Sequence, residues 1–238
     1  MSKTQYQTTA HHGQDPMDRN VFRIRLTNAF RSRLAALSLA VSGILFVLYP
    51  AIRPFSDESS LQGALAFASF SWVLAHSLAM LAFVLLTLGL LGLSLRLQAT
   101  TVAHRAIPAL VLSWIGVGLT LPYYGAETFG LHAIGQEALK QQNPALLSLV
   151  SSVRWEQGIV FILVGLLLLA VGTLLFAIAV WRSGSLPRWS GIPLAIGFAL
   201  YIPQFSMPQF IRVGHGLFLL LACLMLAWSM WKRNRAAQ

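Results

Sequence analysis

The sequence predicts an all-α integral membrane protein, a single bundle of six transmembrane helices with both termini in the cytoplasm. Composition predicts the class, because charged residues make up 10% of the chain and hydrophobic residues 56%, whereas soluble domains carry roughly 25% charged residues. Hydropathy predicts the helices, and the distribution of lysine and arginine predicts the orientation. Residues 1–33 form a basic cytoplasmic tail in this interpretation, and residues 34–235 form the transmembrane domain.

The apolar runs that define the bundle can each cross a hydrocarbon core about 30 Å thick, which takes roughly 20 helical residues. They cover residues 34–52, 66–95, 106–124, 157–181, 190–205 and 213–231. Backbone polar groups find no water inside lipid, and these runs are continuously apolar rather than alternating, so helices are favoured over a barrel. The fifth run is the shortest, and Pro193 and Pro203 bracket it.

The first run follows a long polar and basic segment and lacks a cleavage-like pattern of small residues, so we interpret it as a retained helix rather than a signal peptide. Within that segment, Phe22, Leu26 and Phe30 recur at a spacing of four. This spacing is compatible with an interfacial helix over residues 19–33. Ordinary topological anchoring by the arginines explains the same residues and is the favoured interpretation.

The orientation follows from sorting the 17 lysines and arginines by loop. With the N-terminus inside, four residues fall in outer segments: Arg53, Lys140, Arg154 and Arg212. The other thirteen fall in inner segments: Lys3, Arg19, Arg23, Arg25, Arg31, Arg33, Arg96, Arg105, Arg182, Arg188, Lys232, Arg233 and Arg235. Cationic residues bias loops toward the cytoplasm. The high pI therefore reflects helix ends rather than a phosphate-binding face, which argues against a nucleic-acid partner.

Glycines on the fourth apolar run predict close helix packing. Gly158, Gly165 and Gly172 recur every seven residues and form one bare seam along a helix face. Weak similarity between residues 70–124 and 155–205 also suggests a duplicated helix pair, although Leu-rich helices resemble one another by composition. The single cysteine, Cys223, excludes an intramolecular disulfide.

Polar side chains gather at the predicted outer ends of the helices. His76 lies 20 residues before Arg96, and His215 lies 17 residues before Lys232. These separations correspond to about 30 and 26 Å of helix, so both imidazoles reach the outer edge of the hydrocarbon layer and are expected to face the bundle interior. The candidate ligand-binding residues are His76, Tyr124, Glu127, His132, Glu156, Gln157, Gln204 and His215.

Two kinds of function remain open for these residues. One is a non-enzymatic binding or accessory protein, whose outward-facing pocket takes a small amphiphile or a partner helix within the lipid bilayer. The other is a membrane enzyme or redox subunit. In that case zinc bound by His76, Glu127, His132 and His215, or haem b held between His76 and His215, would supply the chemistry. The sequence has no His-x-x-x-His or Gly-x-Ser-x-Gly pattern, so no cofactor and no enzyme class is predicted.

The C-terminal third carries a faint family resemblance. The pattern "LPRWSGIPLAIG", followed by an apolar helix and "WSMWKR", resembles a broad group of uncharacterised small multi-pass bacterial membrane proteins. The resemblance implies a multi-pass protein of the bacterial inner membrane, and it implies no activity.

Overall fold

The computed structural model describes residues 16–156 and 158–235, with the side chains of residues 30–156 and 158–232. The described part of the chain is all-helical and contains no β-strand. Among the described residues, five helical stretches are long and apolar enough to cross a membrane, which is compatible with a membrane protein and does not confirm the predicted count of six. They cover Phe30–Ile52, Phe70–Leu97, Ala103–Lys140, Pro144–Ser183 and Gln209–Lys232.

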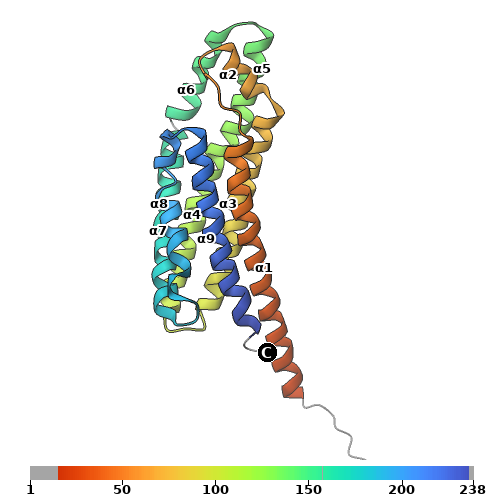
Figure 1. The fold of residues 1–238 in the computed structure, drawn as a ribbon, viewed down its shortest axis with the longest axis vertical. Helices are drawn as coiled ribbons and strands as arrows, with labels where there is room; N and C mark the ends of the chain where they lie inside the picture. Colours follow the sequence, from red (N-terminus) through yellow and green to blue (C-terminus); the bar gives the residue numbers. More distant parts are fainter. Residues whose placement is uncertain (1–15, 157, 236–238) are drawn as a thin grey trace, which may run out of the picture.

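The helices of the bundle form a closed ring. Around the ring in chain order lie α1 (Pro16–Ile52), α3 (Phe70–Leu97), α4 (Ala103–Gly125), α7 (Gly158–Ser183), α8 (Ile192–Ala199) and α9 (Gln209–Arg235). Each packs on the next, and α9 closes the ring against α1 (Figure 1). The start of α1 and the end of α9 lie at the same end of the bundle.

The segment expected as a sixth spanning helix, residues 190–205, folds as a short helix with irregular ends. Helix α8 has eight residues and is flanked by the 3₁₀ turns Arg188–Gly191 and Pro203–Ser206. Prolines remove backbone donors, so Pro203 favours such a turn over a continuing α-helix. The segment nevertheless leads from the end of α7 at one end of the bundle to the start of α9 at the other.

Two other boundaries differ from the sequence prediction. The run predicted over 66–95 breaks at Ser69, whose hydroxyl accepts a hydrogen bond from Trp72 N at 3.2 Å and caps α3. The preceding residues belong to a separate helix, α2 (Leu61–Ala68). The basic segment 19–33 is continuous with the first spanning helix, because α1 runs unbroken from Pro16.

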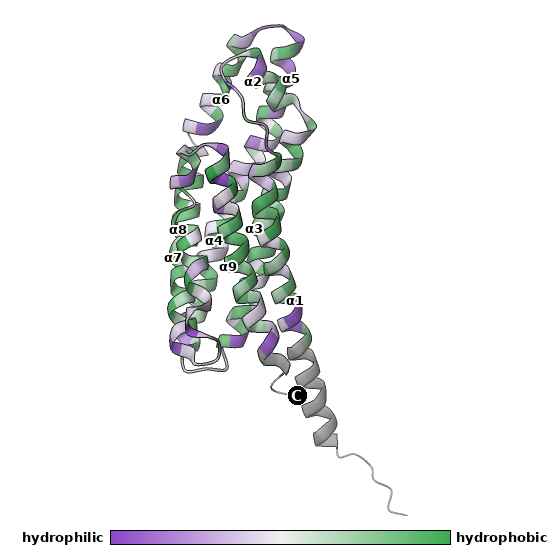
Figure 2. Ribbon diagram, in the orientation of Figure 1, coloured by the Kyte–Doolittle hydropathy of each residue, from purple (hydrophilic) through white to green (hydrophobic). Residues whose placement is uncertain are grey.

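A helical cap stands on the end of the bundle opposite the start of α1 and the end of α9 (Figure 1). Helix α4 continues through a π-helical turn, η1 (Ala126–Gly130), into α5 (Leu131–Lys140). This stretch of 38 residues is about 57 Å long, well beyond the thickness of a hydrocarbon core. Helix α2, the 3₁₀ turn η2 (Pro144–Ser148), α6 (Leu149–Ser151) and the π turn η3 (Ser152–Glu156) complete the cap. Hydrophilic residues concentrate in the cap and at the opposite end, with hydrophobic helices between them (Figure 2).

Two cores correspond to the bundle and the cap. Inside the ring, the Phe46 ring packs edge-on against Phe83, Phe198 and Tyr201 at centroid separations of 5.1, 5.8 and 5.9 Å. The cap has its own buried cluster, formed by Ala64, Phe67, Trp72, Leu131, Ala138, Leu147 and Val150. The polar residues described below lie between these two cores.

The predicted glycine seam faces α4. A Cβ added at Gly165 would lie 2.8 Å from Gly116 O, and one added at Gly172 would lie 2.9 Å from Ala109 O. Both distances are shorter than van der Waals contact, so the two backbones meet where glycine removes the side chain.

Candidate functional site

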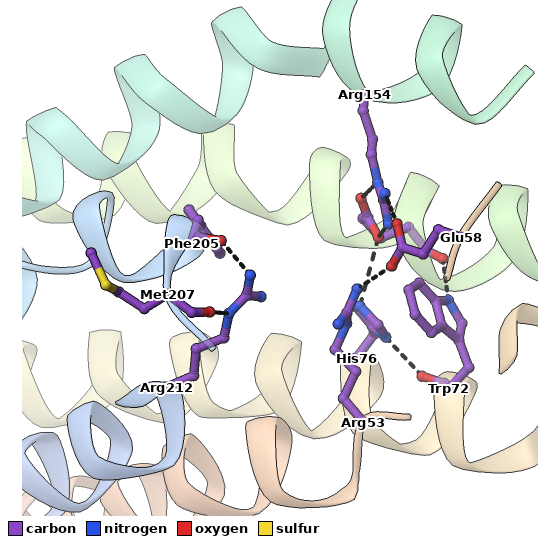
Figure 3. A network of polar contacts seen from close by, with 9 residues as sticks. Arg53, Glu58, Trp72, His76, Arg154, Phe205, Met207 and Arg212 are labelled. Atoms are coloured by element: carbon purple, nitrogen blue, oxygen red, sulfur yellow. Dashed lines mark hydrogen bonds and ion pairs between the residues drawn. The ribbon is translucent and has the colours of Figure 1, made fainter. Parts of the chain in front are cut away.

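A chain of four ion-paired side chains lies at the joint between the bundle and the cap. Arg53 follows the end of α1, Glu58 lies in the loop leading to α2, and Glu127 and Arg154 lie in the two π turns. π turns widen a helix locally and often occur at functional sites. Here they place a carboxylate and a guanidinium from separate helices opposite each other. We call Arg53, Glu58, Glu127 and Arg154 the charged network (Figure 3).

Arg154 is the centre of the charged network. Its Nε and Nη2 donate to the two carboxylate oxygens of Glu127 at 2.5 and 3.0 Å, a bidentate pair. Its Nη1 donates to Glu58 Oε2. The other oxygen of Glu58 accepts a hydrogen bond from Arg53 Nη2 at 2.8 Å. Two cations therefore balance two carboxylates in fixed alternation.

His76 adjoins the charged network from α3 and is buried. Its Nδ1 lies 2.8 Å from Trp72 O, and because a carbonyl only accepts, Nδ1 carries the proton. Nε2 then faces Glu127 Oε2 at 3.8 Å. The indole of Trp72 donates to Glu127 O at 2.7 Å, so one aromatic residue of the cap core holds both the imidazole and the glutamate backbone in place.

Aromatic rings surround the guanidinium of Arg53. It lies 4.5 Å from the Phe55 ring centroid and 4.6 Å from that of Trp72, and its Nε is buried without a hydrogen-bond partner among the described residues. Arg212 lies over the same Phe55 ring at 5.2 Å and donates to the carbonyls of Phe205 and Met207. The start of α9 is thus joined to the same polar layer.

The loop carboxylates are held in the ionised form. Burial raises the pKa of Glu58, but the hydrogen bond and charge of Arg154, followed by those of Arg53, outweigh it and leave this pKa below its ordinary value. Hydrogen bonds from the hydroxyl and backbone N–H of Ser59 lower the pKa of Asp57. Both carboxylates remain charged at neutral pH.

A polar cavity of about 380 Å³ opens beside the charged network. Its lining includes Glu58 and Arg154 and the hydroxyl-bearing residues Ser148 and Ser151. Trp155, 67% exposed, lies at its edge. The remaining lining residues are Ser59, Pro144, Ala145, Leu147 and Val150. The carboxylate of Glu58 and the guanidinium of Arg154, held in place by their ion pair, therefore both line a cavity that solvent can reach.

The structure brings only some of the predicted site residues together. His76 and Glu127 lie side by side as described, and Tyr124 is buried nearby with its hydroxyl 3.1 Å from that of Tyr201. His215 lies across that tyrosine pair, with Nε2 2.8 Å from Gly197 O and its ring 5.4 Å from the Tyr201 ring. In the described part of the chain the two histidines make no contact with each other.

The other predicted site residues lie apart from His76. His132 contacts Phe67 O at 2.9 Å and Gln136 within the cap, and Gln204 is buried in its 3₁₀ turn. Glu156 is exposed to solvent, and Gln157 lies outside the described residues. Among the described residues no three His, Cys, Asp or Glu side chains are grouped as metal ligands.

The sequence-based site omitted Arg53, Glu58 and Arg154. A signal for the two arginines was present, because arginines at the predicted outer ends of helices oppose the general bias of positive charge toward the cytoplasm. Of the four cations predicted to lie outside, Arg53 and Arg154 belong to the charged network, and Arg212 joins the same layer.

Comparison with protein-family models, curated proteins and solved structures finds no match for this chain.

Proposed function

We propose that this protein spans a bacterial cell membrane six times, with both termini in the cytoplasm and the cap outside. The positive-inside bias supports this orientation. The return of residues 188–206 along the bundle supports a sixth crossing, since a short helix with irregular ends is tolerated at membrane depth where protein surrounds it.

At the outer end, the protein binds a small single-chain amphiphile with a zwitterionic head. The charged network beside the polar cavity is the observation that carries this proposal. A buried ion network contributes little net stability compared with apolar residues of the same volume, so its presence favours a role in recognition. Glu58 offers a carboxylate to a cationic group, and Arg154 offers a guanidinium to an anionic one.

Exposed apolar side chains near the cavity offer a contact surface to the acyl chain of such a ligand. Trp155 lines the cavity and is 67% exposed, and Leu149, which lies in the chain between the lining residues Ser148 and Val150, is 49% exposed. Cavities of this size suit small molecules, with a few polar groups fixing the orientation of the head. The zinc and haem alternative receives less support, because its proposed ligands are not brought together: His76 adjoins Glu127, whereas His132 contacts Phe67 O in the cap and His215 lies beyond the Tyr124–Tyr201 pair.

The test is thermal unfolding of purified protein in a neutral detergent, with added lysophosphatidylethanolamine or, as an uncharged comparison, monolaurin. At 100 times its dissociation constant, a ligand specific to the folded state stabilises it by about 2.7 kcal/mol, which is several degrees for a chain of this size. Only the zwitterionic lipid should give this shift.

Two matched variants locate the site. Ser151 lines the cavity and Ser152 does not, and both are exposed. Ser151→Trp should abolish the shift by filling the cavity, whereas Ser152→Trp should preserve it. Equal shifts with both lipids, or an undiminished shift in Ser151→Trp, would contradict the proposal.

A further inference from the structure

A second cavity forms a groove between α7 and α8. These two helices are labelled in Figure 1 and belong to the bundle rather than to the cap. Its volume is about 600 Å³, within the range of small-molecule sites. Its lining is almost wholly apolar: Ala170, Val171, Leu174, Ala177, Ile178, Trp181, Arg182, Ile192, Ala195, Ile196 and Ala199. The four alanines account for the hollow, since larger residues at these positions would bring the two helices' side chains into contact.

The groove has the depth of one leaflet. On α7 it extends from Ala170 to Arg182, which is about 18 Å of helix, compared with about 15 Å for half of a hydrocarbon core. Its walls are open to the side, because Leu174 and Ile196 are 52% and 46% exposed. A straight acyl chain lying along the bundle would meet apolar groups over its whole length.

Cations lie at one end of the groove. Arg182 lines its mouth, and Arg188 is exposed at the same end of the bundle. Neither makes an ion pair with a described residue, and residues 158–235 contain no aspartate or glutamate. Trp181 and Trp189 pack edge to face at 4.5 Å beside them, which is typical of the headgroup level of a membrane.

The groove between α1 and α9 provides a contrast. It is similar in size, about 590 Å³, and is lined by Trp228 and Trp231. There the cations are already engaged, with Lys232 4.7 Å above the Trp228 ring and Arg33 5.6 Å above the Trp231 ring. In the α7–α8 groove the tryptophans pair with each other, and the arginines remain available to an external anion.

We infer that the α7–α8 groove binds one anionic phospholipid. One acyl chain lies along the groove, and Arg182 pairs with the headgroup phosphate. Arg188 adds a second positive charge at the same end, which favours a lipid of net negative charge over a zwitterionic lipid whose headgroup also carries a cation. This site is separate from the outer cavity and does not depend on the function proposed for that cavity.

The experiment uses native mass spectrometry of the full-length protein, delipidated in a neutral detergent and titrated with phosphatidylglycerol or phosphatidylcholine of identical acyl chains. Wild-type protein should bind phosphatidylglycerol with an apparent affinity at least about fivefold higher than its affinity for phosphatidylcholine. A factor of about five is the contribution expected of one arginine near an anionic headgroup. Arg182→Gln should remove most of that preference. Arg105→Gln, which removes the same charge at the same end but on α4, should keep it.

A groove-filling variant tests the acyl-chain contact. Ile196 is 46% exposed, so Ile196→Trp can enter the groove without displacing a core residue, and it should weaken binding of both lipids severalfold. Equal affinity of wild-type protein for the two lipids would overturn the inference. So would equal losses of preference in Arg182→Gln and Arg105→Gln, or undiminished binding by Ile196→Trp.

Discussion

Substituting alanine for Gly165 tests how closely α4 and α7 approach. The new Cβ would lie 2.6 Å from Thr120 Oγ1, 2.8 Å from Gly116 O and 3.0 Å from Thr120 N. The threonine hydroxyl is itself fixed by a 2.8 Å hydrogen bond to Gly116 O. Because two of the three neighbours are backbone atoms, a side-chain rotation cannot relieve the clash, and the helices must separate.

The required separation sets the size of the effect. Restoring an ordinary contact of about 3.4 Å to Gly116 O moves the helices apart by about 0.6 Å, and a gap of that size forfeits a quarter to a half of the local dispersion energy. Overpacking of this kind typically costs about 1–3 kcal/mol. For a chain of this size the melting temperature should fall by roughly 4–8 °C at the middle of that range.

Gly118→Ala is the matched control. Like Gly165 in α7, Gly118 lies in the interior of a helix, here α4, but a Cβ at Gly118 would meet no atom within 4 Å. Alanine at this position should therefore leave stability unchanged or raise it by up to about 1 kcal/mol. Thermal unfolding of both variants in the same detergent, followed by tryptophan fluorescence, makes the comparison. Equal melting temperatures for Gly165→Ala and Gly118→Ala would refute the close backbone packing.

The charged network and the topology give the remaining outcomes. Arg154→Met leaves the carboxylates of Glu58 and Glu127 without their shared cation, so the free energy of unfolding should fall by about 3–5 kcal/mol. The control is Lys140→Met at an exposed position, whose thermal unfolding should match that of wild type. A comparable loss of stability in Lys140→Met would contradict the central role of Arg154 in the charged network. Because its folded-state pKa is lowered, Glu58 contributes stability above its unfolded pKa of about 4.3, which is lost as pH falls through the lower folded value. Melting temperatures between pH 6 and 3 should therefore decline less steeply for Glu58→Gln than for wild type, and parallel curves would argue against this contribution. A reporter fused after Lys140 should be active outside the cell, and one fused after Arg235 inside. The reverse pattern would invert the proposed orientation.

The class of protein and most of its spanning helices could be predicted from the sequence, because crossing a membrane is a local requirement on composition and length. The glycine seam could also be predicted from the sequence, since a seven-residue spacing defines a helix face without reference to any partner. The helix that packs against this seam could not be predicted. Gly165 packs on Gly116, 49 residues earlier in the chain, and no local pattern predicts that pairing.

Local chemistry also explains where helix prediction failed. The break at Ser69 depends on one side chain capping the next helix, inside a run that hydropathy alone treats as continuous. The third run was predicted to end at residue 124, but the helix continues beyond it and carries Glu127 and His132. The π turn within this continuation cannot be recognised from the periodicity of the sequence. The cap therefore emerged only with the structure.

The sequence by itself determined that charged residues would lie at the ends of the helices, because a charge is costly inside lipid and must lie at an interface or find a partner. It also placed His76 at that level. Only the tertiary structure decided the partners: Arg154 reaches Glu58 across 96 positions and Glu127 across 27, and His76 lies beside Glu127 while His215 lies beyond the Tyr124–Tyr201 pair. Ion pairing depends on distances of a few ångströms between side chains, and those distances are set by how the ring of helices closes and how the cap packs on it, which no single segment of the chain encodes.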